Sequence, residues 1–275
     1  LPVAVKLFHN DYDYELVTYT DAGYDEVDEI ERADDYAFGG KAYATIWLGA
    51  SNTLVASLAG VEEVYEAEEV FPGADEASLR TYNVALEDEW RLTESVSVAL
   101  GGIYTFFDQV EIGEDSNAFN PQLVASWQLP GDVSLRASAA QRSRFPKLRE
   151  LYRLRYGNPD LKEEVADSYE IGLRHGFDNG IALDMAVFLI EPDGMIDRPT
   201  RNSRYQNLEE SEISGFEIAA GGWLGERTYL HAGYSLVDAA EELPGGHERQ
   251  LRSRPEHTVT GELRYRFPNR LLLSL

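Results

Sequence analysis

The chain has 275 residues, no cysteine and a formal net charge of −25 at pH 7. The lack of cysteine excludes disulfide bonds and thiolate metal sites, and so acidic a chain is a poor partner for nucleic acid. No apolar run reaches the roughly eighteen residues of a membrane-spanning helix. Residues 1–15 lack the basic start and apolar core of a signal peptide, so we expect none in this sequence.

Alternation of apolar and polar residues predicts β-strands along the chain. Residues 96–106 place Val96, Leu100 and Phe106 on one face, which is typical of a strand with one apolar and one polar face. Short turns are predicted near residues 51–52, 93, 130–131, 178–179, 225 and 268–269. Long polar loops are predicted at residues 10–37, 67–78, 108–118, 143–166, 193–205 and 239–255.

The two kinds of connection alternate, which indicates that all the long loops lie at one end of the sheet. A membrane barrel has this asymmetry, with short turns on the periplasmic side and long loops outside. Counting between turns predicts about thirteen antiparallel strands, many of them long enough for a tilted membrane strand. The chain is therefore predicted to be an all-β, antiparallel transmembrane β-barrel segment. A soluble β-structure stays open as an alternative.

Aromatic residues cluster near the predicted strand ends. Indole rings favour the headgroup region of a membrane, where the ring is half buried and its N–H stays hydrated. A periplasmic girdle is predicted from the tryptophans that shortly precede short turns: Trp47, Trp90, Trp127 and Trp223. Ordinary strand-end aromatics are the alternative. Tyr104, Phe106 and Phe107 are predicted to form the outer girdle, or else to stack on a ligand.

The second face of the predicted strands carries charged side chains. On a membrane barrel this face must point into the lumen, because the lipid face penalises charge. The residues predicted to face the lumen, or a plug domain inside it, are Arg136, Glu170, Arg174, Glu217, Glu262 and Arg264. On a soluble barrel or sandwich the same face would meet water.

Several motifs of the chain resemble a known family. Between Arg144 and Gly172 the order is Phe-Pro, Leu-x-Glu-Leu-Tyr, Gly-Asn-Pro-Asp-Leu and Tyr-Glu-x-Gly. Later come Tyr-Gln-Asn at 205–207, Ser-Gly-Phe-Glu at 214–217 and Arg-Pro-Glu-His at 254–257. In this order the motifs resemble the barrel domain of TonB-dependent receptors, the outer-membrane nutrient transporters of Gram-negative bacteria.

The resemblance covers about residues 78–270 and implies a function. It implies a receptor of the cell outer membrane, not an enzyme and without a cofactor, that imports a scarce nutrient such as a ferric siderophore or a similar metal chelate. Its partners would be the lipid bilayer and lipopolysaccharide, the chelate, and the TonB energy-coupling protein acting through a plug domain. Family barrels have twenty-two strands and a plug, so residues 1–275 are expected to be a partial barrel domain without the plug. A passive porin or adhesin barrel stays open.

Arginines concentrate in the second half of the chain. Residues 1–135 hold 27 acidic and 5 basic residues, whereas residues 136–275 hold 22 and 19. The planar fork of arginine suits carboxylate, catecholate-type oxygen or phosphate, so arginines on neighbouring long loops predict a site for an anionic chelate. The candidates are Arg144, Arg149, Arg153, Arg155, Arg198, Arg201, Arg204, Arg249 and Arg252, with Arg142, Lys147 and Arg254 beside them. Lipopolysaccharide phosphates, and ion pairs with acids on other loops or on the plug, are the alternatives.

The remaining candidates concern metals and catalysis. Asp25, Asp28 and Glu29 lie in an acidic run and are candidate Ca²⁺ ligands, but the run lacks the ordered ligand spacing of a calcium loop, and such runs are usually solvated. The five histidines show no spacing typical of a metal site. No catalytic residue is therefore predicted, although a hydrolase triad assembled from distant residues stays open.

Overall fold

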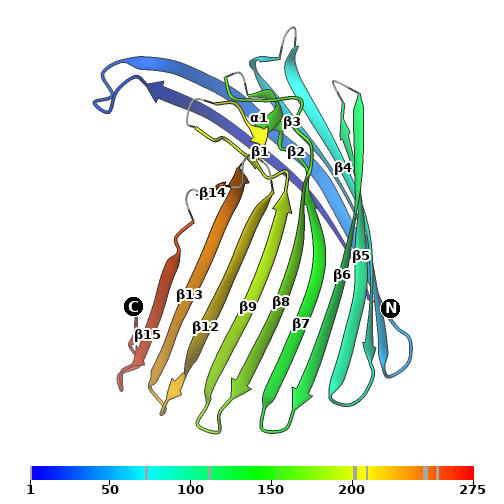
Figure 1. Cartoon of the computed structure of the whole chain (residues 1–275), viewed down its shortest axis with the longest axis vertical. Coiled ribbons are helices and arrows are strands. Elements are labelled where there is room, and N and C mark those ends of the chain that lie inside the picture. The colour runs from blue at the N-terminus through cyan, green and yellow to red at the C-terminus, as the bar shows by residue number, and fades with distance from the viewer. Residues whose placement is uncertain are drawn as a thin grey trace.

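The computed structural model describes residues 2–71, 74–110, 113–153, 155–200, 203–208, 210–243, 247–251 and 254–275. Its main feature is one curved antiparallel sheet of 14 strands (Figure 1). The first strands are β1 (Val3–Tyr19), β2 (Val27–Trp47), β3 (Asn52–Phe71), β4 (Ala74–Arg91), β5 (Val96–Gln109), β6 (Glu114–Leu129) and β7 (Val133–Arg144). The helix α1 (Leu148–Tyr152) follows β7.

The second half of the chain continues the sheet in order. Its strands are β8 (Glu164–Gly176), β9 (Ile181–Asp193), β12 (Ser211–Leu224), β13 (Thr228–Leu243), β14 (His247–Gln250), β15 (His257–Arg266) and β16 (Leu272–Ser274). Two short strands, β10 (Ile196–Asp197) and β11 (Gln206–Asn207), pair separately, and β14 pairs only with β13. Among the residues that the structure describes, no helix is long and apolar enough to cross a membrane.

The short turns lie where the sequence predicts them, all at the lower end of the sheet in Figure 1. Four of them contain a glycine with positive φ: Gly49 at 91°, Gly131 at 79°, Gly180 at 81° and Gly225 at 71°. Glycine adopts this conformation without the steric cost that a Cβ atom brings. The turn glycines in the sequence therefore determine where the strands end at the lower edge of the sheet.

Three of the predicted long loops are strands instead. β1 and β2 stay paired through most of residues 10–37, β3 and β4 pair as far as Phe71↔Ala74, and β5 and β6 pair through much of residues 108–118. The ladder depends on backbone hydrogen bonds, so a strand with polar side chains on both faces still pairs. Such a strand lacks the apolar alternation by which strands are recognised. The acidic first half thus forms paired polar extensions of the sheet.

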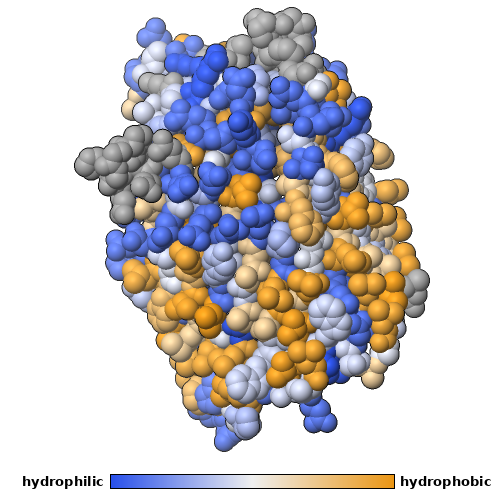
Figure 2. Space-filling view, turned by 45° about the vertical axis from the view of Figure 1, so that its right-hand side comes forward, coloured by the Kyte–Doolittle hydropathy of each residue, from blue (hydrophilic) through white to orange (hydrophobic). Residues whose placement is uncertain are grey.

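The two faces of the sheet differ in polarity. The register places apolar side chains in one cross-strand row on the outward face: Trp127, Leu135, Leu173, Met185, Ile218, Tyr234 and Val259. Large apolar side chains on this face stay exposed, among them Ile171 at 62% and Leu58 at 59%. Figure 2 shows apolar residues over the lower part of the molecule and polar residues above them. An exposed apolar belt of this extent requires a non-aqueous neighbour.

The best-buried residues form a cluster at the outer end of the concave face. Leu151 and Tyr152 of α1, exposed by 0% and 2%, belong to one apolar cluster with Tyr65, Leu79 and Phe107 of β3, β4 and β5. The loop after β7 therefore reaches across the concave side of the curved sheet to strands that precede it by many residues. Phe107, predicted for a girdle or a ligand stack, packs in this cluster, with its ring stacked on Phe145 at 4.6 Å.

Candidate functional site

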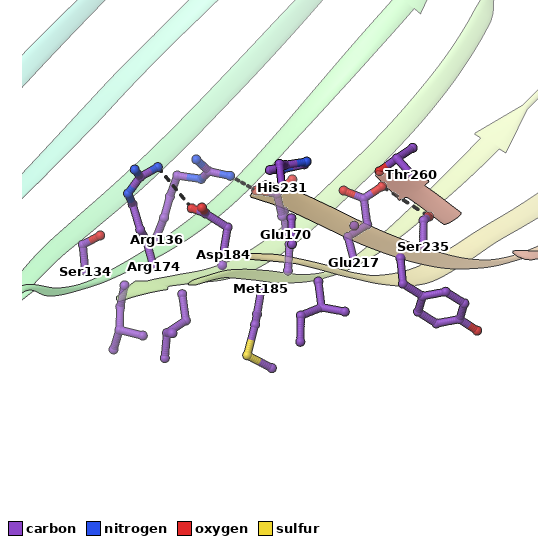
Figure 3. A pocket seen from close by; sticks show the side chains of 18 of the residues that line it. Ser134, Arg136, Glu170, Arg174, Asp184, Met185, Glu217, His231, Ser235 and Thr260 are labelled. Carbon is purple, nitrogen blue, oxygen red and sulfur yellow. Dashed lines mark hydrogen bonds and ion pairs between the residues drawn. The ribbon is translucent and has the colours of Figure 1, made fainter. Parts of the chain in front are cut away.

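The concave face of the sheet carries a cavity of about 720 Å³ lined by side chains of β6 to β15. Figure 3 shows Arg136, Glu170, Arg174, Asp184 and Glu217 pointing to one side of the sheet, with apolar side chains on the other side. Arg136 pairs with Glu170, and Arg174 Nη1 lies 3.2 Å from Asp184 Oδ1. Opposite charges thus neutralise one another across neighbouring strands. The wall is polar, with its charges largely balanced.

The six residues predicted to line the lumen share this concave face. Arg136 and Glu217 lie in one cross-strand row that continues to Ser235, whose Oγ donates to Glu217 Oε1 at 3.5 Å. On β15, Glu262 and Arg264 are two residues apart on the same face and form an ion pair. The register therefore brings together side chains that the sequence grouped only by alternation. Their position inside a complete barrel stays a prediction.

Two long loops at the outer end are joined by asparagine side chains. Asn207 Nδ2 donates to Lys162 O at 3.0 Å and to Gly194 O at 2.6 Å, and its Oδ1 accepts from Lys162 N at 3.0 Å. Asn158 Nδ2 donates to Tyr205 O at 2.9 Å. Both asparagines belong to the motifs that resemble the family. In the structure they connect the loop after β7 to the loop after β9.

Backbone bonds reinforce this connection. Tyr205 N donates to Tyr156 O at 2.9 Å between the loops, and within the first loop Asn158 N donates to Glu150 O at 2.8 Å. Leu161 and Leu208, exposed by 4% and 6%, are buried at the junction. The described residues of 145–163 and 194–208, called the loop unit below, therefore form one structure at the outer end of the sheet (Figure 1).

Arg144 anchors the base of the loop unit. Its Nε donates to Glu164 Oε2 at 2.8 Å, and its Nη1 donates to Glu150 Oε2 at 2.8 Å. Hydrogen bonds donated to Glu164 raise the pKa of the guanidinium further above its ordinary value, against the opposing effect of partial burial, and Glu150 adds to the rise. The positive charge of Arg144 is therefore permanent and already used by two carboxylates.

Three further candidate arginines are held by acids, two of them far away in the sequence. Arg149 Nη2 lies 3.4 Å from Asp35 Oδ2, and its guanidinium covers the ring of Tyr14 at 4.1 Å. Arg155 Nη1 donates to Asp28 Oδ2 at 2.8 Å. Arg249 Nε donates to Glu241 Oε2 at 3.0 Å, and that carboxylate is almost fully buried. Ion pairing with acids elsewhere in the chain, an alternative that the sequence left open, thus accounts for much of the basic half.

A second group of arginines surrounds one tyrosine. The guanidinium of Arg198 lies 4.0 Å from the centre of the Tyr156 ring, and those of Arg153 and Arg155 lie at 5.2 and 5.4 Å. Such cation–π contacts gather three cationic groups around one aromatic ring. Arg204, which directly precedes Tyr205 in the sequence, is exposed. The remaining candidates, Arg201 and Arg252, lie outside the described residues.

Comparison with known proteins decides the family. Residues 5–272 match the family described as TonB dependent receptor-like, beta-barrel. This chain belongs to the TonB-dependent receptors. An iron-regulated outer membrane virulence protein of Vibrio cholerae is 24% identical in an alignment 216 residues long, which covers 68% of this chain and 31% of that protein. The vitamin B12 transporter of Photobacterium profundum is 26% identical in an alignment 194 residues long, which covers 65% of this chain and 31% of that protein.

The fold agrees with solved receptors of this kind. The copper transporter OprC superposes with a TM-score of 0.76 at 15% sequence identity, over 96% of this chain and 47% of that one. The receptor chain thus spans about a third of its curated relatives and about half of a solved structure with its fold. The predicted all-β fold and the outer-membrane location are confirmed, and the family to which the chain belongs is one of receptors.

The outer-membrane location gives the apolar face its neighbour, which is lipid. The register then separates the four tryptophans. Trp127 shares the outward face with Leu135, and Trp90 shares it with Val98. Trp47 and Trp223 lie on the polar face, where Trp223 packs edge-on against Tyr229 at 5.6 Å and Arg266 covers its ring. The predicted girdle of four tryptophans is therefore corrected to two: a lipid contact stays a prediction for Trp90 and Trp127.

The acidic outer strands of the receptor show no metal site among the described side chains. Asp28, one of the calcium candidates, pairs with Arg155, Asp25 is exposed in the loop after β1, and the side chain of Glu29 lies outside the described residues. Partial burial near the loop unit raises the pKa of Glu63, Lys147 opposes this rise, and Asp35 adds to it. The carboxylates near the loop unit thus interact with its charged side chains and contribute to how the loops pack on the sheet.

Sequence reasoning missed the apolar contact of the loop unit with the sheet. Leu151 and Tyr152 in Leu-x-Glu-Leu-Tyr and Leu161 in Gly-Asn-Pro-Asp-Leu are apolar residues within a polar loop, and all three are buried. That pattern is the available signal, because a solvated loop has no reason to carry buried-type side chains. Their partners on β3, β4 and β5 are not recognisable from the loop sequence.

Proposed function

We propose that the intact receptor imports a metal chelate, such as a ferric siderophore, across the outer membrane, with energy supplied by the TonB protein through a plug domain in the barrel. Three similar proteins support this cargo class by their descriptions: one is iron-regulated, one transports copper, and one transports vitamin B12, itself a metal chelate. The descriptions differ in the individual ligand, so the shared chemistry, a complexed metal, is the proposed substrate class.

The observation that carries the proposal is the loop unit at the outer end of the concave wall. A folded structure that closes over a polar wall suits capture of a ligand before passage, whereas an open diffusion pore needs no such structure. Within it, Arg153 and Arg198 lie over the ring of Tyr156, Arg198 also lies over that of Tyr205, and the exposed Arg204 directly precedes Tyr205. Cationic forks next to aromatic rings fit an anionic chelate with oxygen donors and flat groups. We assign the first ligand contact to this cluster.

Uptake by cells that express the intact gene product tests the proposal. The host lacks other receptors for the chelates, and a panel of radiolabelled ferric chelates and labelled vitamin B12 is offered with and without functional TonB. We expect saturable uptake of at least one metal complex that disappears without TonB. Equal uptake in both hosts would instead establish a passive barrel.

Matched variants test the assignment of the ligand contact. Arg198→Ala together with Arg204→Ala removes two charges from the cluster and is expected to raise the half-saturation concentration about tenfold or more, since hydrogen bonds to charged groups contribute about 1.5–3 kcal/mol each. Arg227→Ala, in the turn between β12 and β13 at the opposite end, changes one charge without touching the cluster. Equal half-saturation in the cluster variant and the turn variant would refute the assignment.

A further inference from the structure

A second, smaller cavity of about 240 Å³ lies on the concave face at the outer ends of β7, β8 and β9. Its lining includes Arg142 and Arg144 of β7, Glu164 of β8, Met195 in the loop after β9, and Arg254 in the segment before β15. The register puts Arg142 opposite Ala166 and Arg144 opposite Glu164. Three arginines from two distant parts of the chain therefore meet around one small cavity.

The three arginines differ in how their charges are compensated. Arg144 is held by the carboxylates of Glu150 and Glu164, as described above. Among the described residues, Arg142 and Arg254 form no ion pair with a carboxylate, and Arg254 Nη2 has only the Sδ of Met195, at 3.5 Å, as a weak acceptor. Two uncompensated cations thus face the cavity in a chain whose net charge is −25.

Uncompensated like charges around a cavity repel one another and favour an anion between them. We propose that this cavity is a subsite for a carboxylate group of the transported ligand, bound between Arg142 and Arg254. The proposal rests on the proposed import function and adds to it the chemical class of one ligand arm. Arginine offers two parallel N–H donors to a carboxylate, which gives such a subsite directional preference as well as charge.

Size and position narrow the ligand further. Pockets for a complete drug-sized ligand measure roughly 300–1,000 Å³, so a cavity of about 240 Å³ takes one arm of a chelate. The cavity opens on the concave face, opposite the face that meets lipid, so phosphates of membrane headgroups do not reach it. It lies beside the loop unit, because Met195 accepts the backbone bond from Leu208 N at 2.8 Å. A ligand captured at the outer cluster has the subsite as its next anion-binding position along the wall.

Titration calorimetry on the intact, detergent-purified receptor tests the subsite directly. Citrate serves as the carboxylate probe and inorganic phosphate as the comparison anion, each at low salt. We expect citrate to bind to the parent protein and the variant Arg142→Gln with Arg254→Gln to bind it about tenfold or more weakly, because two charge-assisted bonds are lost. Arg227→Gln, in the turn between β12 and β13 at the opposite end of the sheet, is the control and should change citrate affinity less than about twofold.

The outcomes separate the possibilities. Heat-modifiable migration first shows that each variant is folded, and Arg142→Lys with Arg254→Lys, which keeps both charges, should retain part of the affinity. Absence of citrate binding to the parent protein at millimolar concentration, or equal affinity in the glutamine variant, would overturn the subsite. Phosphate bound as tightly as citrate would overturn its carboxylate preference. The calorimetric assay needs no TonB, so a negative result would refute the subsite without refuting the import function. Passive uptake in cells would likewise refute energy-coupled import without changing the binding result.

Discussion

The sharpest prediction concerns Asn207, which joins the two loops of the receptor. Asn207→Ala removes three hydrogen bonds, two with Lys162 in an exposed setting and one with Gly194 O that is partly buried. Exposed bonds contribute at the low end of the usual range of about 0.5–1.5 kcal/mol and buried ones at the high end. The substitution should therefore destabilise the closed loop unit by about 2–3.5 kcal/mol, equivalent to a 30- to 300-fold larger opening constant.

Hydrogen exchange measures this opening constant at individual amides. The reporter is the Tyr205 amide, which bonds to Tyr156 O across the two loops at 2.9 Å. Its exchange should accelerate by about the same 30- to 300-fold, because local opening controls exchange of protected amides. Asn207→Asp should accelerate it at least as much at neutral pH, since a carboxylate would face the carbonyl oxygens that now accept hydrogen bonds from the amide.

A matched control lies at the other end of the sheet. Asn179 also uses its side chain to hold backbone, accepting from Ile181 N at 3.1 Å in the short turn between β8 and β9. Asn179→Ala should leave exchange at Tyr205 unchanged. The reasoning fails if Asn207→Ala changes the Tyr205 amide less than about threefold, since the loops would then be held together mainly by apolar burial.

Three further predictions follow from packing, lipid contact and charge. Leu151→Ala, at a fully buried site, should destabilise the loop unit by about 2–5 kcal/mol, seen as faster proteolysis of the loop after β7. Val187→Arg puts a charge on the outward face and should destabilise the folded barrel in the membrane by about 2–4 kcal/mol. The fraction of protein that shows heat-modifiable migration, which marks the folded form, should fall. Ala186→Arg, opposite Glu217 on the concave face, should leave this fraction unchanged. The pKa of Glu63 is raised in the closed loop unit, so between the ordinary and the raised pKa the closed form binds more protons than the open form. The stability of the closed form therefore falls as pH rises through that window. Glu63→Gln should abolish this pH dependence, which is measured by amide exchange at several pH values.

Local features of the chain were predictable because their causes are local. A glycine that adopts positive φ, as Gly131 and Gly180 do, marks a turn within a few residues. Period-two alternation marks the two faces of a strand wherever one face meets an apolar environment. The lower turns, the polarity of the faces and the shared face of Arg136 and Glu217 were therefore predicted correctly. The same reasoning failed in residues 10–37, where polar side chains occupy both faces along most of the paired strands and few positions, such as Ala33, join the core.

Partners across the concave side were decided by the tertiary structure alone. Arg155 meets Asp28 across 127 residues of sequence, and Arg149 meets Asp35. The sequence by itself determined that arginines concentrate on the outer loops, but it contains no signal for which acids compensate them. Curvature of the sheet decides that, because it brings the loop after β7 over β3 and β4 and leaves Arg254 beside Met195, without a carboxylate partner in the part of the chain that the structure describes. The alternation that builds the wall is a property of neighbouring residues, whereas the compensation of the loop charges depends on the curvature of the whole sheet.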